Sequence, residues 1–202
     1  MKILLIADGI YPFSMGGSHR SIFELANQLH KRNHDITCIV PIIRDSQNMY
    51  MKSDKWENRN GFKIIRFNVP KNVILRLISY FFIFKLEYLK LNQEFDIVNI
   101  HYLPALSRFN RFFKQKKNIV YSFHGPWSEE LLEVINGKFK KIIFPLNIIF
   151  RIIINSFLFS FLTIIEKSIL RNSNTFVVNS DYMKKKLEKN VSKNDTYISK
   201  IY

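Results

Sequence analysis

The sequence predicts an α/β fold, a doubly wound and mostly parallel β-sheet flanked by helices. Six short runs are rich in Ile and Val, and most of them are apolar throughout. Such runs are typical of parallel strands whose two faces are both covered by helices. Helical runs separate them, which indicates right-handed crossover connections. The predicted strands are residues 2–7, 36–41, 62–67, 96–101, 118–123 and 175–179.

Apolar residues at helical spacing predict the elements between the strands. The first helix follows Gly16 and Gly17, and Ser21 with Glu24 forms a predicted capping box at its start. Basic residues at 30–32 close this helix, where positive charge suits the carbonyl end of the helix dipole. The polar stretch 44–60 is predicted to be a loop. Further helices are predicted at residues 72–91, 104–115, 129–135, 144–171 and 181–189.

Composition narrows the class of protein without choosing a function. The 202 residues are enough for one domain with a sizeable core. Lys and Arg number 31 against 16 Asp and Glu, a net charge of +15, which favours polyanionic partners. No aromatic-interleaved basic strand or zinc-finger spacing is present, so nucleic acid is not an expected partner. Cys38 is the only cysteine, which excludes a disulfide framework and suits a reducing cytoplasm.

The almost entirely apolar stretch 142–165 is long enough to cross a bilayer. Arg151 and two Asn residues would then lie in hydrocarbon, and a central charge costs roughly 2.5–3.5 kcal/mol on insertion scales. We therefore expect a long helix that is buried along one face, with lipid contact along the other face as an open alternative.

The two adjacent glycines after the first predicted strand admit two interpretations. They let a backbone approach a ligand, and the amides of a helix start favour an anion such as a diphosphate. The alternative is a simple turn. The sequence has neither Gly-x-Gly-x-x-Gly nor a Gly-Lys-Ser/Thr ending, and Pro41 stands where a dehydrogenase has an acidic residue. These absences disfavour dehydrogenases, P-loop ATPases and other α/β nucleotide binders.

His124 lies in the segment Phe123-His124-Gly125-Pro126-Trp127, directly after a predicted strand. Open α/β sheets bind ligands at the carboxyl ends of their strands. An imidazole there can donate a hydrogen bond to a sugar hydroxyl or to a leaving group. A purely structural histidine is the alternative, and His30, His34 and His101 are expected to be surface or strand-end residues.

Four motifs in a fixed order carry a resemblance to a known family. They are Gly16-Gly17 with Leu25-Ala26-x-x-Leu29 and His34-Asp35-Ile36-Thr37; Asp96-Ile97-Val98-Asn99-Ile100-His101; Tyr121-Ser122-Phe123-His124-Gly125; and Glu166 followed by Val177-Val178-Asn179-Ser180. Together they resemble the N-terminal domain of family-four retaining glycosyltransferases, which have the GT-B fold. Asn33 and Asn99 depart from the family pattern, away from the proposed chemistry.

The resemblance implies roles for particular residues. Gly16 and Gly17 would contact the diphosphate of a nucleotide-sugar donor, and His124 would face the transferred sugar. His19 and Trp127 are candidate acceptor-side residues. Most members need no metal, no Asp-x-Asp occurs here, and no cofactor is expected.

The resemblance also implies a division of the protein. Residues 1–190 would form the Rossmann-like acceptor-side domain, and 191–202 an exit segment or truncated linker. The donor-gripping residues would belong to a second domain. We expect the N-terminal half of a cytoplasmic glycosyltransferase of polysaccharide biosynthesis, inactive alone, peripheral on the inner face of the membrane, with a glycan or lipid-linked acceptor. A separate donor-domain chain is a candidate partner. The alternative is a non-catalytic module that binds an anionic membrane surface or a partner chain.

Overall fold

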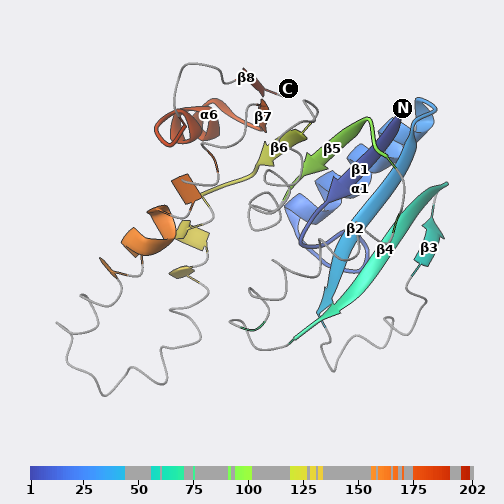
Figure 1. Cartoon of the computed structure of the whole chain (residues 1–202), viewed down its shortest axis with the longest axis horizontal. Helices are drawn as coiled ribbons and strands as arrows, with labels where there is room; N and C mark the ends of the chain where they lie inside the picture. The colour runs from blue at the N-terminus through green and yellow to red at the C-terminus, as the bar shows by residue number, and fades with distance from the viewer. Residues whose placement is uncertain are drawn as a thin grey trace. The chain divides into compact units, whose positions relative to one another are not determined.

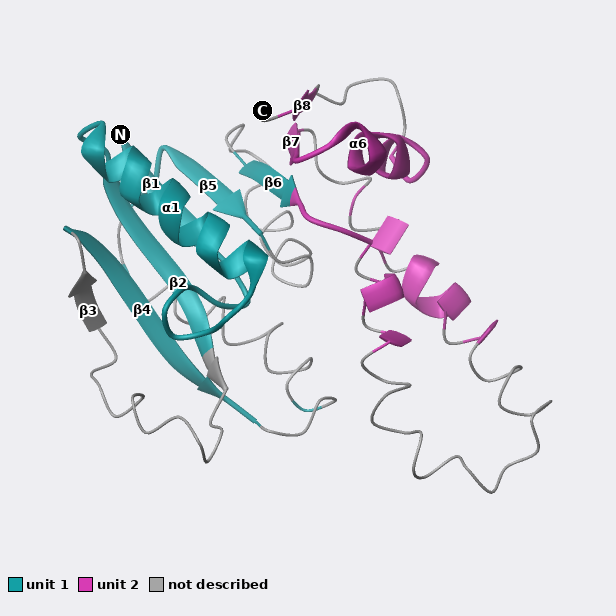
Figure 2. Ribbon diagram, turned by 180° about the vertical axis from the view of Figure 1, so that it is seen from behind, with its two compact units in different colours: residues 1–122 teal, residues 123–202 magenta. Residues whose placement is uncertain are grey.

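The computed structural model has two compact units, Met1–Ser122 and Phe123–Tyr202 (Figure 2). The structure describes residues 1–43, 56–59, 61–70, 75, 91, 94–101, 119–126, 128–130, 132–133, 156–157, 159–164, 166–167, 170, 175–191 and 197–200.

The first unit is built on a mostly parallel sheet (Figure 1). Its strands run in the order β3-β4-β2-β1-β5-β6. The neighbouring strands pair in parallel, except β3 and β4, which are antiparallel. This confirms the predicted α/β class. The strands are β1 (Lys2–Ile6), β2 (Asp35–Ile43), β3 (Trp56–Arg59), β4 (Phe62–Val69), β5 (Ile97–Ile100) and β6 (Ile119–Phe123).

Both faces of the central strands are buried, as the continuous apolar runs predicted. On β1, Ile3 and Leu5 belong to the cluster that packs with helix α1 (Gly17–Lys31). The alternate residues Leu4 and Ile6 are equally inaccessible to solvent. Because successive side chains of a strand point to opposite faces, the sheet is covered on both sides here. The α1 side chains in the core are Ile22, Phe23 and Ala26.

The start of α1 corrects one prediction. The helix begins at Gly17 with Gly16 as its N-cap, and no side chain caps it. Ser21 therefore lies within the helix, exposed like Glu24, and the predicted capping box is wrong. The residue types of a capping box do not determine this helix start, because α1 already begins directly after the glycine loop. The basic closing turn is confirmed, with His30 and Lys31 in the last turn.

The second unit contains a parallel strand pair and its connecting helix. Strands β7 (Thr175–Val178) and β8 (Tyr197–Lys200) pair in parallel, and α6 (Asp181–Glu188) lies between them in the chain. The Ser180 hydroxyl accepts a hydrogen bond from the Met183 amide at 3.2 Å and so caps α6. Further helical residues are 128–130, 132–133, 156–157, 159–164, 166–167 and 170.

Two strands lie where the sequence predicted none. Trp56–Arg59 of the predicted loop forms β3. Gly61, with φ 87°, makes the turn into β4, a conformation that side-chain-bearing residues rarely adopt. The predicted exit segment contains β8.

Three of the later predicted helices are confirmed at their described residues. They are the helices at 129–135 and 144–171, and the one at 181–189, which corresponds to α6. The helix at 104–115, and all but residues 75 and 91 of the one at 72–91, lie outside the described residues. Among the described residues, no helix has the length and apolar character needed to cross a membrane.

Candidate functional site

The loop between β1 and α1 folds back over the first turn of the helix. The Tyr11 amide donates to the His19 carbonyl at 3.2 Å, and the Ser14 amide donates to the Ile10 carbonyl at 3.0 Å. The Phe13 ring lies under the guanidinium of buried Arg66, with Cζ 4.2 Å from the ring centroid. These contacts fix the loop at the carboxyl end of β1, the end at which parallel sheets bind ligands.

The two glycines leave the amino end of α1 open. Both are exposed, and a Cβ built on Gly17 would meet no atom within 4 Å. A Cβ on Gly16 would lie 3.1 Å from Nδ1 of His19. Since no side chain caps the helix, the amides of its first turn carry the positive end of the dipole toward open space. This end of α1 can therefore receive an anionic group.

His19 is held close to these amides by Asp8. Its Nε2 lies 3.4 Å from Oδ1 of Asp8. The hydrogen bond and charge of Asp8 raise the pKa of His19 above its ordinary value, against partial burial, which lowers it; the backbone of Met15 adds a smaller contribution. The ring also lies against Gly9, where a Cβ would be 2.8 Å from Nε2. Asp8 thus shifts the His19 ring toward its protonated form beside the open helix end.

His101 lies at the same edge of the sheet in the first unit. Its amide donates to the Ile6 carbonyl at 2.8 Å, directly where β1 ends and the glycine loop begins. The side chain is buried. From the sequence, His101 was expected only to end the strand 96–101.

His124 belongs to the second unit, directly after β6. Its Nδ1 lies 3.4 Å from the side-chain amide nitrogen of Asn179. If the Asn179 amide donates to this nitrogen, the proton of a neutral His124 ring lies on Nε2. In that tautomer His124 presents a hydrogen-bond donor at Nε2. The next residue, Gly125, has little room for a side chain, because a Cβ there would lie 2.6 Å from Oε1 of Glu130.

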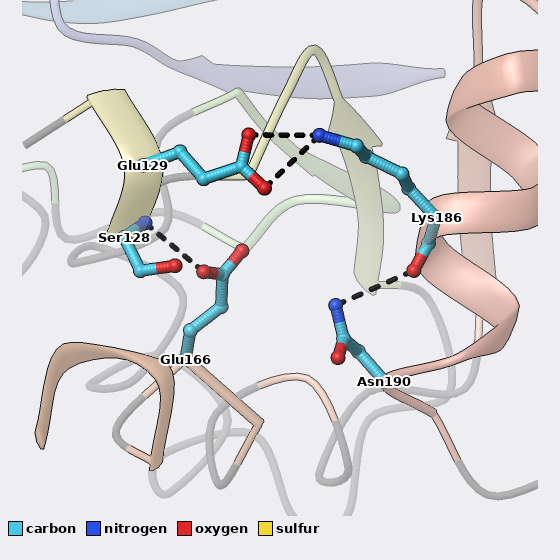
Figure 3. Close-up of polar contacts among 5 residues, drawn as sticks. All are labelled: Ser128, Glu129, Glu166, Lys186 and Asn190. Atoms are coloured by element: carbon cyan, nitrogen blue, oxygen red, sulfur yellow. Dashed lines mark hydrogen bonds and ion pairs between the residues drawn. The ribbon is translucent and has the colours of Figure 1, made fainter. Parts of the chain in front are cut away.

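Acidic side chains fasten the helical turn that follows the His-Gly segment (Figure 3). Buried Glu166 accepts a hydrogen bond from the Ser128 amide at 3.0 Å. Both oxygens of Glu129 accept from Nζ of Lys186, at 3.0 and 2.7 Å, and this raises the pKa of Lys186. The Asn190 side chain donates to the Lys186 carbonyl at 3.3 Å. Residues distant in sequence thus hold this turn in place.

Comparison with known families decides what kind of protein carries these features. The model of Glycosyltransferase Family 4 matches residues 15–198, nearly the whole chain. The chain belongs to glycosyltransferase family 4. The matched region includes both glycines of the helix start and the His124 segment. A search of curated protein sequences gave no match.

Solved structures match the fold over essentially the entire chain. Sucrose-phosphate synthase from Thermosynechococcus elongatus matches 99% of the chain with a TM-score of 0.61 at 15% identity. A segment of the same protein matches 100% of the chain with a TM-score of 0.59, and the chain covers 88% of that segment. An E. coli structure described as trehalose-6-phosphate bound with UDP-2-fluoro glucose matches 99% with a TM-score of 0.51 at 10% identity. The chain spans about half the length of the first and third proteins, 47% and 48%.

The family 4 fold brings together only some of the residues singled out by sequence. Gly16, Gly17 and His19 meet at one end of α1 within the first unit. His124 lies in the second unit, and Trp127 lies outside the described residues. In the described part of the chain, no group of three or more His, Cys, Asp or Glu side chains could hold a metal ion.

Sequence reasoning missed Asp8 and Asn179. Asp8 lies 11 positions before His19, and Asn179 lies 55 positions after His124. Neither spacing fits a local pattern, so the sequence does not reveal these pairs. Position was the available signal for a site residue, because Asp8 directly follows a predicted strand and Asn179 ends one.

Proposed function

We propose that this family 4 chain is the acceptor-side half of a retaining glycosyltransferase. It would help transfer a sugar from a nucleotide-sugar donor to a glycan or lipid-linked acceptor. The observation that carries the proposal is the uncapped amino end of α1, open at Gly17, within a region that matches the family. The UDP-sugar in the E. coli structure is consistent with such a donor.

The proposed role of the glycine loop is to hold the donor diphosphate. Amides at a helix start donate to phosphate oxygens, and the helix dipole favours their negative charge. Glycine at 17 leaves the approach unobstructed, since a side chain would project into open space there. Cationic His19 would add charge on the same side and is also an acceptor-side candidate.

The proposed role of His124 is to donate a hydrogen bond through Nε2. Asn179 favours the tautomer in which that nitrogen carries the proton. A donor placed against a sugar hydroxyl or a developing negative charge stabilises the transition state when it binds the charged form more strongly. Trp127 remains proposed as an acceptor-side residue on the resemblance alone.

Tested by itself, the 202-residue chain should show no transfer. The donor would be held from one side only, and the resemblance assigns the donor-gripping residues to a second domain. Transfer should appear when these 202 residues are combined with a donor-binding domain, in the same chain or as a separate one. Assays with radiolabelled sugar nucleotides measure this.

Nucleotide binding gives a direct test on the chain alone. The ¹⁵N-labelled protein is titrated with UDP while amide chemical shifts are followed by NMR. We expect shifts at Gly17 and Ser18, and no shifts at α6, which serves as the internal control. Gly17→Val should weaken binding about tenfold or more without unfolding the protein, because it obstructs an open approach. Ser21→Val, also exposed on α1, is the matched control. Unperturbed Gly17 and Ser18 amides at saturating UDP would refute the proposed role of this loop.

A further inference from the structure

A stripe of large apolar side chains is exposed on a helical stretch of the second unit. The stretch comprises the helical residues 156–157, 159–164, 166–167 and 170, drawn in orange tones in Figure 1. Phe157, Phe161 and Ile164 are 74%, 53% and 66% exposed. Because helical residues three and four apart are neighbours on one face, these three side chains form a continuous row, here called the Phe157 stripe.

The opposite face of the same stretch is packed against the protein. Leu162, Glu166 and Leu170 recur four apart and are 6%, 2% and 0% exposed. Glu166 also accepts the Ser128 amide at 3.0 Å, which fastens this face within its unit (Figure 3). The Phe157 stripe therefore points outward from an anchored helix. A contiguous exposed apolar patch of this kind marks an interaction surface.

We propose that the Phe157 stripe docks this protein on the surface of an anionic lipid bilayer. Charge complementarity selects this occupant. The chain carries +15, and its sequence from residue 134 to 165 contains no Asp or Glu, whereas it contains Lys138, Lys140, Lys141 and Arg151. Phenylalanine on one face together with basic residues is the composition of helices that lie in the membrane interface.

The stripe lies on the bilayer and does not cross it. The described helices include none fit to span a membrane, and the back of this one is occupied by buried Glu166. Only the outward row can enter the boundary between headgroups and acyl chains, with the helix axis parallel to the surface. Binding therefore combines apolar burial of the stripe with attraction between the net positive charge of the chain and anionic headgroups.

A second copy of the chain is the competing occupant. Two molecules that each carry +15 repel one another. An anionic bilayer supplies the opposite charge. The observations thus favour lipid over self-association.

Vesicle flotation tests the inference on the full 202-residue chain. The vesicles are equimolar phosphatidylglycerol and phosphatidylcholine, with pure phosphatidylcholine for comparison. We expect the protein to float with the anionic vesicles at low salt, and much less with the neutral ones. The double variant Phe157→Ser/Phe161→Ser should lower the partition coefficient about tenfold or more, because it removes most of the inserted apolar area. Tyr182→Ser removes an aromatic side chain that is 62% exposed on α6 of the same unit, and should bind like the wild type.

Three results would overturn the inference. They are a wild-type protein that ignores anionic vesicles at low salt, a double variant that binds as well as the wild type, and a wild-type dimer that the double variant dissociates in sedimentation equilibrium. Thermal unfolding checks that the variants fold, which we expect because the substituted side chains are exposed. The assay contains no sugar nucleotide or acceptor, so its outcome is independent of the proposed transfer activity.

Discussion

At the scale of single residues, the informative pair is His19 and Asp8, which joins the first turn of α1 to the loop before it. The ring is largely shielded, with 17% of its side chain accessible, whereas the Asp8 side chain is 41% accessible. A charged histidine tolerates such shielding only with a partner. The pair therefore closes the loop and raises the pKa of His19 near the candidate phosphate site.

Asp8→Asn should lower the pKa of His19, because the substitution removes the negative charge that favours the imidazolium. NMR titration of the His19 ring protons measures this, with His34 at the far end of α1 as the internal reference. The pair should also stabilise the fold. Since the folded state raises the pKa, that stabilisation is fully present below the ordinary value of 6.5 and is lost as pH rises through the raised value.

The expected stability difference between wild type and Asp8→Asn is about 0.2–1 kcal/mol in mildly acidic solution, because solvent screens a partly exposed pair. Urea unfolding should show this difference shrinking toward alkaline pH. An unchanged His19 titration in Asp8→Asn would show that another group sets this pKa.

At the scale of elements, the sequence predicted the strands that lie in the middle of the sheet. Strands β1, β2, β4 and β5 are rich in Ile, Val, Leu and Phe, and most of their described apolar side chains are buried, as expected for strands covered by helices. The missed strands have a more polar composition. Segment Trp56–Arg59 is mostly polar and pairs antiparallel to β4, and Tyr197–Lys200 ends in the polar residues Ser199 and Lys200. Their pairing comes from partners elsewhere in the fold, which local composition does not encode.

Local sequence patterns likewise point to only some residues of the candidate site. Gly16 and Gly17 are a local signal, because adjacent glycines before a helical pattern indicate a loop and a helix start in one place. His124 has a positional signal at a strand end. Their partners Asp8 and Asn179 come from distant parts of the sequence, so the geometry that assigns a charge or a tautomer required the structure.

The N-cap of α6 offers a test at this scale. The Ser180 hydroxyl satisfies the Met183 amide, and Ser180→Ala would leave that donor without its side-chain partner. We expect a loss of about 1 kcal/mol in the free energy of unfolding. Ser180→Asp keeps an acceptor at the same position and should lose much less. Urea unfolding followed by circular dichroism measures both, and equal stability of Ser180→Ala and wild type would mean that α6 contributes little to the cooperative fold.

At the scale of the whole molecule, the family 4 fold is combined with an unusual excess of positive charge. The exposed ion pairs Lys186–Glu129 and Lys200–Asp181, each at 2.7 Å, oppose this excess only locally. Such surface pairs contribute little individually. Repulsion among the remaining cations acts throughout the chain and favours less compact states. The net electrostatic contribution to folding is therefore expected to be unfavourable near neutral pH.

Added NaCl should accordingly stabilise the protein near neutral pH. Salt screens both the attractive pairs and the overall repulsion, but with a net charge of +15 the repulsion is the larger quantity. A gain of about 1 kcal/mol would raise the melting temperature by about 2–4 °C in a protein of this size. Scanning calorimetry at low and moderate NaCl measures it, and chloride avoids the general stabilisation that sulfate causes. The matched control is pH near the isoelectric point of about 9.9, where the net charge vanishes and the salt effect should disappear. A melting temperature that falls with salt at neutral pH would show instead that specific ion pairs outweigh the repulsion.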